Sequence, residues 1–407
     1  MPRSSAPTKL WYVTKWLRTV NRRRGWFMEH PTPRKLTNLA LAGAQYALKR
    51  QALSTWPVIV KVDISPLCNL HCTICVHARP SEGSNPLLKS QAFDAGQIMS
   101  CVQFRRIVDE IAGKSEAVSL YYLGDPLVHP DLDAMCRITW QAGLNSHVNT
   151  NLSFNLSDDR LYKLVTSGLT HLTVCVDGLS QETYGRTRVG GRIAVVLDNL
   201  KRLIRCRSEL GRVYPRVEVQ YIKFQHNVGE FEEATRRFTA MGVDQISEFW
   251  GSLHNYTDLA PGNYRVFGPR NSGVLPLCPW PYFAIQIKYN GDVIPCCNYR
   301  LGLQYSSTSG PQDQRIIGNV FQTSLWEIWN SPTYRALRRF VSHPARMRRE
   351  PILAETFCDG CPRLFDTDTA EVMRSGHKYH WEELYAFDNK GHVVRQASAI
   401  PGPGKAP

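Results

Sequence analysis

Between residues 56 and 251, short apolar runs alternate with longer stretches in which apolar residues recur every three or four positions. The short runs are typical of strands, and the longer stretches are typical of amphipathic helices. The expected strands are residues 58–64, 117–123, 145–149, 171–176, 216–223 and 244–249. The expected helices are residues 104–112, 132–142, 158–167, 193–207 and 228–241. These β/α repeats predict an α/β fold in which a parallel sheet curls into a partial (β/α)6 barrel.

The segments outside this region carry other patterns. Small and apolar residues at intervals of three and four predict a helix that ends near residues 49–50, and they are Leu36, Leu39, Ala40, Gly43, Ala44 and Ala47. Residues 252–277 lack periodicity and contain several Pro and Gly, which is typical of a linker. Apolar alternation over residues 283–289, followed by Asn290-Gly291, predicts a β-hairpin.

These patterns divide the chain into five expected parts. Residues 1–55 form an N-terminal extension, residues 56–251 the barrel, residues 252–277 a linker and residues 278–387 a cysteine-rich domain. Residues 388–407 are rich in Gly, Pro and Ala, so we expect a disordered tail there.

Composition narrows the class of protein. With 407 residues, 43% of them hydrophobic and 21% charged, the chain is an ordinary globular protein, long enough for two domains. It contains no run of eighteen apolar residues and no secretion signal, so we expect a cytoplasmic protein without a membrane span. Its twelve cysteines, grouped in short motifs, then favour metal binding over disulfides.

The formal net charge of +14 is concentrated at the N-terminus. Residues 1–55 hold eleven Lys and Arg against Glu29, a net of about ten of the fourteen charges. In the first 35 residues these cations are interleaved with aromatic side chains. Three interpretations stay open: a helical arm packed on the barrel, peripheral contact of residues 1–50 with an anionic membrane surface or glycan, and, least favoured, nucleic-acid binding. Peripheral contact would place the protein at the inner face of the membrane.

Cys68, Cys72 and Cys75 form a CxxxCxxC run just after the first expected strand. A loop of this length can wrap one metal centre. A 4Fe–4S cluster usually takes four thiolates, so three leave one iron open to another ligand. Zinc is the alternative at this point, although its structural sites favour paired CxxC or Cys/His sets.

A second set comprises Cys278, Cys296, Cys297, Cys358 and Cys361. The expected hairpin brings Cys278 and Cys296 together, and the distant pair Cys358 and Cys361 can complete a four-thiolate site. Iron–sulfur and zinc are both compatible with these residues alone.

Polar motifs follow three of the expected strands. They are residues 121–126 (YYLGDP), residues 148–151 (VNTN) and residues 174–178 (VCVDG), the last followed by Arg188 within RVGG. Because the carboxyl ends of parallel strands share one edge of a barrel, these motifs should lie near the CxxxCxxC loop. A common turn, a capping turn and a buried salt bridge of Arg188 are the structural alternatives.

Together, the CxxxCxxC run and the strand-end motifs resemble the radical S-adenosylmethionine (radical SAM) enzymes, whose fold is a partial TIM-like barrel. The resemblance implies that Cys68, Cys72 and Cys75 hold a 4Fe–4S cluster. The open iron then binds the amine and carboxylate of S-adenosylmethionine. An electron from the cluster cleaves this cosubstrate, and the 5′-deoxyadenosyl radical removes hydrogen from a substrate.

The same resemblance assigns residues to the cosubstrate. Residues 121–126 match a Gly-Gly-Glu-Pro motif, in which Gly124 and Asp125 would hold the methionyl ammonium. Asn149 and Asn151 fall in a stretch that contacts ribose or carboxylate, and Arg188 would pair with the carboxylate.

Cys278-Pro-Trp, Gly291 before Cys296, residues 318–331 and the Cys358–Cys361 pair resemble the single-cluster SPASM extension of this family. The resemblance implies an auxiliary 4Fe–4S cluster held by Cys278, Cys296, Cys358 and Cys361. Cys297 is then spare, and one speculative role for it is to return a hydrogen atom to the substrate, as in an epimerase.

The expected function is oxidation or epimerisation of a sugar, aminocyclitol or related small metabolite, with a flavodoxin or ferredoxin as electron donor. Maturation of a ribosomal peptide and modification of a lipid-linked or glycan substrate are alternatives. A non-catalytic iron–sulfur redox sensor or scaffold is the alternative from another class.

Overall fold

The computed structural model describes residues 29–72, 75, 77, 96–224, 226–250, 266–296, 316–347, 358, 361, 363–367, 371–374 and 377–380. Most of the basic N-terminal arm, the C-terminal tail and Cys297 lie outside the described residues.

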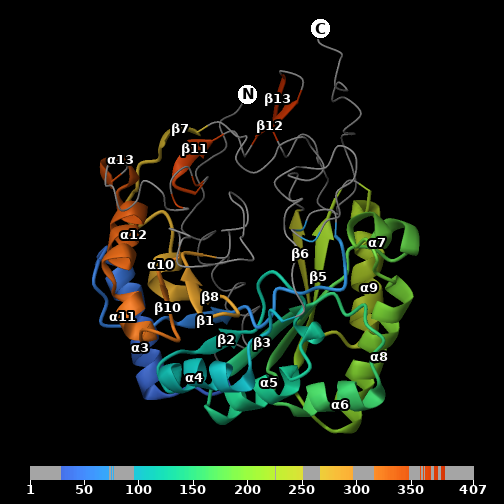
Figure 1. Ribbon diagram of the computed structural model, residues 1–407. Coiled ribbons are helices and arrows are strands. Elements are labelled where there is room, and N and C mark those ends of the chain that lie inside the picture. The colour runs from blue at the N-terminus through green and yellow to red at the C-terminus, as the bar shows by residue number, and fades with distance from the viewer. Residues whose placement is uncertain are drawn as a thin grey trace.

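The core of the molecule is a sheet of nine strands, in the order β10-β9-β8-β1-β2-β3-β4-β5-β6. The six expected strands are confirmed as β1 (Ile59–Val62), β2 (Ala117–Ser119), β3 (Asn145–Thr150), β4 (His171–Cys175), β5 (Arg216–Lys223) and β6 (Gln245–Trp250). Each pairs in parallel with the next. The sheet curves without closing (Figure 1), which confirms the predicted partial barrel.

Helices cover the outer side of this sheet (Figure 1). They are α4 (Cys101–Ile111), α5 (Leu132–Gln141), α6 (Asp158–Thr166), α7 (Gln181–Thr187), α8 (Ile193–Glu209) and α9 (Phe231–Met241), with short 3-10 turns η2 (Pro126–Val128) and η3 (Val228–Glu230). In β1, Val60 and Val62 pack into one core with Phe104 and Ile107 of α4. Side chains at the alternating positions, such as Lys61, therefore face the lumen of the barrel.

The cysteine-rich region extends the same sheet. Strand β8 (Ala284–Ile287) pairs in parallel with β1, and Lys61 lies opposite Gln286. The hairpin turn predicted at Asn290-Gly291 joins β8 to β9 (Asp292–Ile294), and β10 (Gly318–Asn319) adds the edge. Gly291 has φ +88°, and a Cβ there would lie 2.5 Å from the Phe321 ring, so this turn requires glycine. The hairpin thereby carries the second cysteine set to the side of the barrel.

The remaining elements complete this side of the molecule. They are α3 (Pro33–Ala47), α10 (Trp280–Phe283), α11 (Leu325–Trp329), α12 (Pro332–Ser342), α13 (Pro344–Met347) and the small strands β7 (Val266–Pro269), β11 (Phe365–Thr367), β12 (Glu371–Arg374) and β13 (His377–His380). None of the helices in the described part of the chain is long and apolar enough to cross a bilayer.

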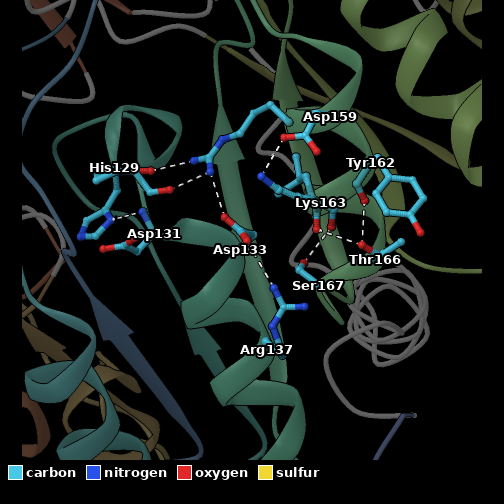
Figure 2. Close-up of polar contacts among 12 residues, drawn as sticks. His129, Asp131, Asp133, Arg137, Asp159, Tyr162, Lys163, Thr166 and Ser167 are labelled. Atoms are coloured by element: carbon cyan, nitrogen blue, oxygen red, sulfur yellow. Dashed lines mark hydrogen bonds and ion pairs between the residues drawn. The ribbon is translucent and has the colours of Figure 1, made fainter.

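Ion pairs join the helices on the outer side of the barrel, as Figure 2 shows around Asp133 of α5. Asp133 accepts from Arg137 at 3.3 Å and from Arg160 of α6 at 2.9 Å. Arg160 also donates to the backbone oxygen of His129 at 2.8 Å, in the loop after β2. Such partly exposed pairs contribute little stability, about 0–1 kcal/mol each, so their effect is to fix the position of α6 against that loop.

Candidate functional site: two cysteine sets around a polar lumen

The CxxxCxxC loop leaves the carboxyl end of β1. Its turn is closed by the Cys75 N–H, which donates to the Cys72 carbonyl at 3.0 Å, and by the Leu70 N–H, which donates to the Cys68 sulfur at 3.4 Å. Burial, followed by the charge of Asp125, raises the pKa of Cys68, and the Cys75 and Cys72 sulfurs add to this rise. The three predicted thiols therefore lie on one short loop, within electrostatic reach of one another.

These thiols fit an iron–sulfur cluster in their chemistry. Burial raises the pKa of the Cys72 thiol to about 11, and the nearby Arg188 guanidinium opposes that rise. As a thiolate, Cys72 would need a positive charge in addition to Arg188, and either iron or zinc could supply it. The family resemblance implies iron, with Cys68, Cys72 and Cys75 as the residues that would hold the radical-generating cluster.

Gly124 supports the cluster loop from the end of β2. A Cβ on Gly124 would lie 2.3 Å from the carbonyl oxygens of both Ser65 and Leu67, so this contact excludes every other residue without a shift of the backbone. The next residue, Asp125, donates its N–H to the same Leu67 oxygen at 2.8 Å. The loop after β2 is thus seated directly on the segment that leads into Cys68.

A Gly124→Ala variant is therefore expected to lose iron from the first cluster and about 1–3 kcal/mol of unfolding free energy, because the methyl group must displace the 65–67 backbone. Iron content per chain and chemical denaturation measure the two effects. The matched control is Gly229→Ala, where a Cβ meets nothing within 4 Å, and it should behave as wild type. Equal iron contents in the two variants would contradict this role of Gly124.

The carboxylate of Asp125 is occupied by internal donors. It accepts from the Leu127 N–H at 3.0 Å, from the Asn151 N–H at 2.7 Å and from the Thr150 hydroxyl at 2.8 Å. Burial raises its pKa to about 6, and these hydrogen bonds oppose that rise. Asp125 therefore ties the loop after β2 to the end of β3, in addition to the ammonium contact that the family resemblance implies for it.

The two asparagines of β3 and its following loop lie in different environments. Asn151 donates to the Asn69 side chain at 2.9 Å and contacts the Cys68 sulfur at 3.9 Å, so it supports the cluster loop. Asn149 faces the lumen, where its side-chain oxygen accepts from the Cys175 thiol at 2.9 Å. Of the two, Asn149 is the better placed to meet a molecule bound inside the barrel.

Arg188 forms a buried ion pair with Asp177 at 2.5 Å. Asp177 also accepts from the Ile222 N–H at 3.0 Å, and Arg188 donates to the Cys72 sulfur. The neighbouring Val189 carbonyl accepts from the His71 N–H at 2.9 Å. Arg188 therefore forms the buried salt bridge that was the structural alternative to carboxylate binding. It also contacts Cys72, an expected ligand of the first cluster.

Four members of the second cysteine set line one cavity of about 490 Å³. Its wall contains Cys278, Cys296, Cys358 and Cys361, and the Cys361 N–H donates to the Cys358 carbonyl at 3.2 Å. Four thiols around one space are the donor set of a closed 4Fe–4S site. These four residues would hold the auxiliary cluster.

The opposite wall of this cavity belongs to the barrel. Lys61 and Tyr121 line it, with the Lys61 ammonium 4.5 Å from the centre of the Tyr121 ring. The cavity of the second cysteine set therefore borders directly on the lumen.

A row of polar and aromatic side chains crosses the lumen from this cavity, and sequence reasoning missed it. The Tyr121 ring lies 5.0 Å from His147, which lies 4.9 Å from His171, both edge to face. The row ends where His171 Nε2 meets the Glu218 carboxylate at 2.8 Å. The sequence signal for this row was the polar residue at every second position of β3, β4 and β5. A lumen packed for stability alone is filled with Val, Ile and Leu, so polar residues at these positions indicate a binding site.

Comparison with known proteins agrees with this geometry. The Radical SAM superfamily matches residues 62–214, and SPASM, an iron–sulfur cluster-binding domain, matches residues 278–362. A tungsten-containing aldehyde ferredoxin oxidoreductase cofactor-modifying protein from Pyrococcus furiosus is 24% identical over 318 residues, which are 68% of this chain and 82% of that protein.

Two solved structures show more distant similarity. The crystal structure of BtrN in complex with AdoMet and 2-DOIA is 14% identical, covers 71% of this chain and 89% of its own, and has a TM-score of 0.40. Streptococcus suis SuiB bound to the precursor peptide SuiA is 16% identical, with 82% and 80% covered and a TM-score of 0.43.

The open α/β barrel, the three cysteines after its first strand and the four cysteines beside it fit the two matched domains, which are those of a class of iron–sulfur enzymes. The chain belongs to the radical SAM superfamily, in the group whose members carry a SPASM domain. Its cofactors are a radical-generating 4Fe–4S cluster, an auxiliary 4Fe–4S cluster and S-adenosylmethionine.

Proposed function

We propose that this enzyme removes hydrogen from a carbon atom of a small polar metabolite, such as a sugar or aminocyclitol, and oxidises or epimerises it. When bound, the first cluster, held by Cys68, Cys72 and Cys75, would supply the electron that cleaves S-adenosylmethionine, and a hydrogen atom would pass from the substrate to the 5′-deoxyadenosyl group. In an oxidation, the auxiliary cluster would accept the remaining electron of the substrate; in an epimerisation, the Cys297 thiol would return a hydrogen atom. The residues of the chain bind and orient the substrate in the lumen and exclude water.

Unpaired polar atoms in the lumen carry this proposal. Among the described residues, His171 Nδ1, Ser247 Oγ and Gln286 Oε1 are buried without a hydrogen-bond partner. All three side chains lie on the luminal face, at positions that alternate with the helix-facing core. Buried polar atoms are almost always paired, by protein, water or ligand. A substrate with several hydroxyl or amino groups would satisfy them.

The electron donor that fits this chemistry is a flavodoxin or ferredoxin. About ten of the fourteen net positive charges lie in residues 1–55, and an acidic electron donor would be attracted to that segment.

Two other substrates remain alternatives: a ribosomal peptide and a lipid-linked glycan. SuiB, a distant structural neighbour, is bound to a precursor peptide. The barrel of this chain is open on one side, which leaves room for substrates of either kind to enter. The small metabolite is placed first because its hydroxyl or amino groups would pair with the three buried polar atoms of the lumen. Peripheral membrane contact is a separate proposal that does not depend on the chemistry.

Transfer of deuterium tests the proposed function. The reduced, reconstituted enzyme is incubated with S-adenosylmethionine and deuterated sugars, aminocyclitols or peptides, and 5′-deoxyadenosine is analysed by mass spectrometry. Deuterium from a sugar or aminocyclitol is the expected result, and deuterium only from peptides would establish the alternative. A protein that binds both clusters but never forms 5′-deoxyadenosine would be a redox sensor or scaffold.

Removing the negative charge at the end of the luminal row should weaken substrate conversion without affecting the first cluster. In a Glu218→Gln variant, we expect about tenfold slower deuterium transfer, since one poorly paired buried group costs ~1–3 kcal/mol. Formation of 5′-deoxyadenosine without substrate should be unchanged. The matched control is Glu182→Gln, whose carboxylate is exposed on α7. Equal transfer rates in both variants would remove Glu218 from the substrate site.

A further inference from the structure

Helix α3 exposes an apolar face to solvent. Six residues at spacings of one helical face are exposed, and they are Leu36, Ala40, Leu41, Ala44, Ala47 and Leu48. The three leucines are 53%, 45% and 66% exposed. At 1.5 Å per residue the stripe extends for about 18 Å. Surface helices normally turn such a stripe toward the core.

The opposite face of α3 holds the helix in place through polar contacts. Lys35 is buried, and its ammonium donates to the backbone oxygens of His30 and Gly143. Asn38 exchanges two hydrogen bonds with the backbone of Trp56, at 2.8 and 3.1 Å. Helix α3 lies on the flank of the molecule beside α11 and α12 (Figure 1). With its polar side chains anchored inward, Leu36, Leu41 and Leu48 are left exposed.

A second segment enlarges the apolar surface. The Lys49 ammonium donates to the Gly273 carbonyl at 2.9 Å, and the Tyr46 hydroxyl donates to the Pro276 carbonyl at 2.8 Å. These contacts bring Val274 and Leu275, which are 87% and 48% exposed, to the C-terminal end of α3. We call the six α3 residues together with Val274 and Leu275 the α3 patch.

The charged residues on α3 and directly after it are all positive. Arg34 and Arg50 are exposed and Lys49 is half-buried, whereas Lys35 is buried on the opposite face, and residues 33–50 contain no acidic residue. The 28 residues that precede the described part of the chain carry seven Lys and Arg, five aromatic residues and no acid. An apolar stripe flanked by cations and aromatic side chains matches an anionic lipid surface, which takes up leucines at its acyl boundary and attracts Lys and Arg at its headgroups.

We propose that the α3 patch is the site by which this enzyme binds an anionic membrane surface, with the basic N-terminal segment adding electrostatic attraction. A second copy of the chain is a poorer occupant, because two equally basic surfaces would repel each other. Residues 1–28 are also a poorer occupant, because their cations would find no acidic side chain on α3. The α3 patch is thus the place at which the peripheral membrane contact proposed above would occur, and this binding does not depend on the radical chemistry.

Vesicle co-sedimentation of the full-length holoenzyme tests the proposal. The probes are vesicles of phosphatidylcholine alone and of phosphatidylcholine mixed with phosphatidylglycerol, at low and high salt. Wild type should bind the mixed vesicles, bind pure phosphatidylcholine weakly, and release on addition of salt. A Leu41→Ser/Leu48→Ser variant should bind the mixed vesicles about tenfold more weakly. The two leucines, exposed in the free protein, would no longer insert at the lipid boundary.

The matched control is Val102→Ser, which removes a side chain 80% exposed on α4, outside the patch. It should bind as wild type does. Circular dichroism confirms folding, and 5′-deoxyadenosine formation, unchanged in all variants, separates this test from the proposed chemistry. Equal binding by the double variant and wild type, or no binding of wild type to mixed vesicles, would overturn the proposal. The proposal would also be overturned if the wild-type protein were a dimer that binds no vesicles, and if the double variant were a monomer. The patch would then be a dimer interface.

Discussion

A Cys72→Ala variant is expected to form no 5′-deoxyadenosine above background under reducing conditions. Cys72 is the buried member of the three-thiol set, and an iron without its thiolate ligand leaves the first cluster incomplete. The four thiols of the auxiliary site are untouched, so the variant should retain about half of the wild-type iron if each site holds one 4Fe–4S cluster. Chromatography of the product and iron analysis measure the two quantities.

The matched control for this experiment is Cys206→Ala, which removes a thiol from α8, outside both cysteine sets. Its iron content and product formation should equal those of wild type. If Cys72→Ala still cleaved S-adenosylmethionine, the open iron would have to be held by other residues.

The second large effect is expected from the buried ion pair behind the first cluster. In Arg188→Met, the Asp177 carboxylate, which is 0% exposed, loses its cationic partner. Removing one member of such a pair costs about 3–5 kcal/mol, because the remaining charge stays buried. Urea denaturation should show this loss, together with reduced iron in the first cluster, since Arg188 also contacts Cys72.

A neighbouring arginine provides the control. Arg186 pairs with Glu182 on the exposed surface of α7, and Arg186→Met should change the unfolding free energy by less than about 1 kcal/mol. In the double variant Asp177→Asn/Arg188→Met, part of the lost stability should return, because no charge is left buried. Similar losses in Arg186→Met and Arg188→Met would contradict the assignment.

The sequence was informative where a local pattern determines the structure. Alternating apolar periodicity predicted all six parallel strands, and Asn290-Gly291 predicted the hairpin between β8 and β9. The spacing of Cys68, Cys72 and Cys75 keeps the three thiols near one another on one loop, because a short loop has few ways to separate three side chains. The family resemblance assigned Gly124 to the cosubstrate, and no local pattern indicated its contact with Ser65 and Leu67, which is the structural reason for glycine at this position.

Features that depend on distant contacts were not predictable in this way. Strand β8 pairs with β1 across more than two hundred residues, and no local pattern encodes that partner. Arg338 lies in a basic helix typical of a solvated surface, yet it is fully buried and donates to the carbonyls of Pro281, Gln51 and Trp329. The periodicity of α3 correctly predicted a helix, but its polar anchors decided which face points outward.

Electron paramagnetic resonance of the reduced, reconstituted enzyme, with and without S-adenosylmethionine, tests the central claim most directly. We expect a 4Fe–4S signal that changes when S-adenosylmethionine is added, because the cosubstrate would bind the iron that Cys68, Cys72 and Cys75 would leave open. A signal that is indifferent to S-adenosylmethionine, or a site filled by zinc, would contradict it.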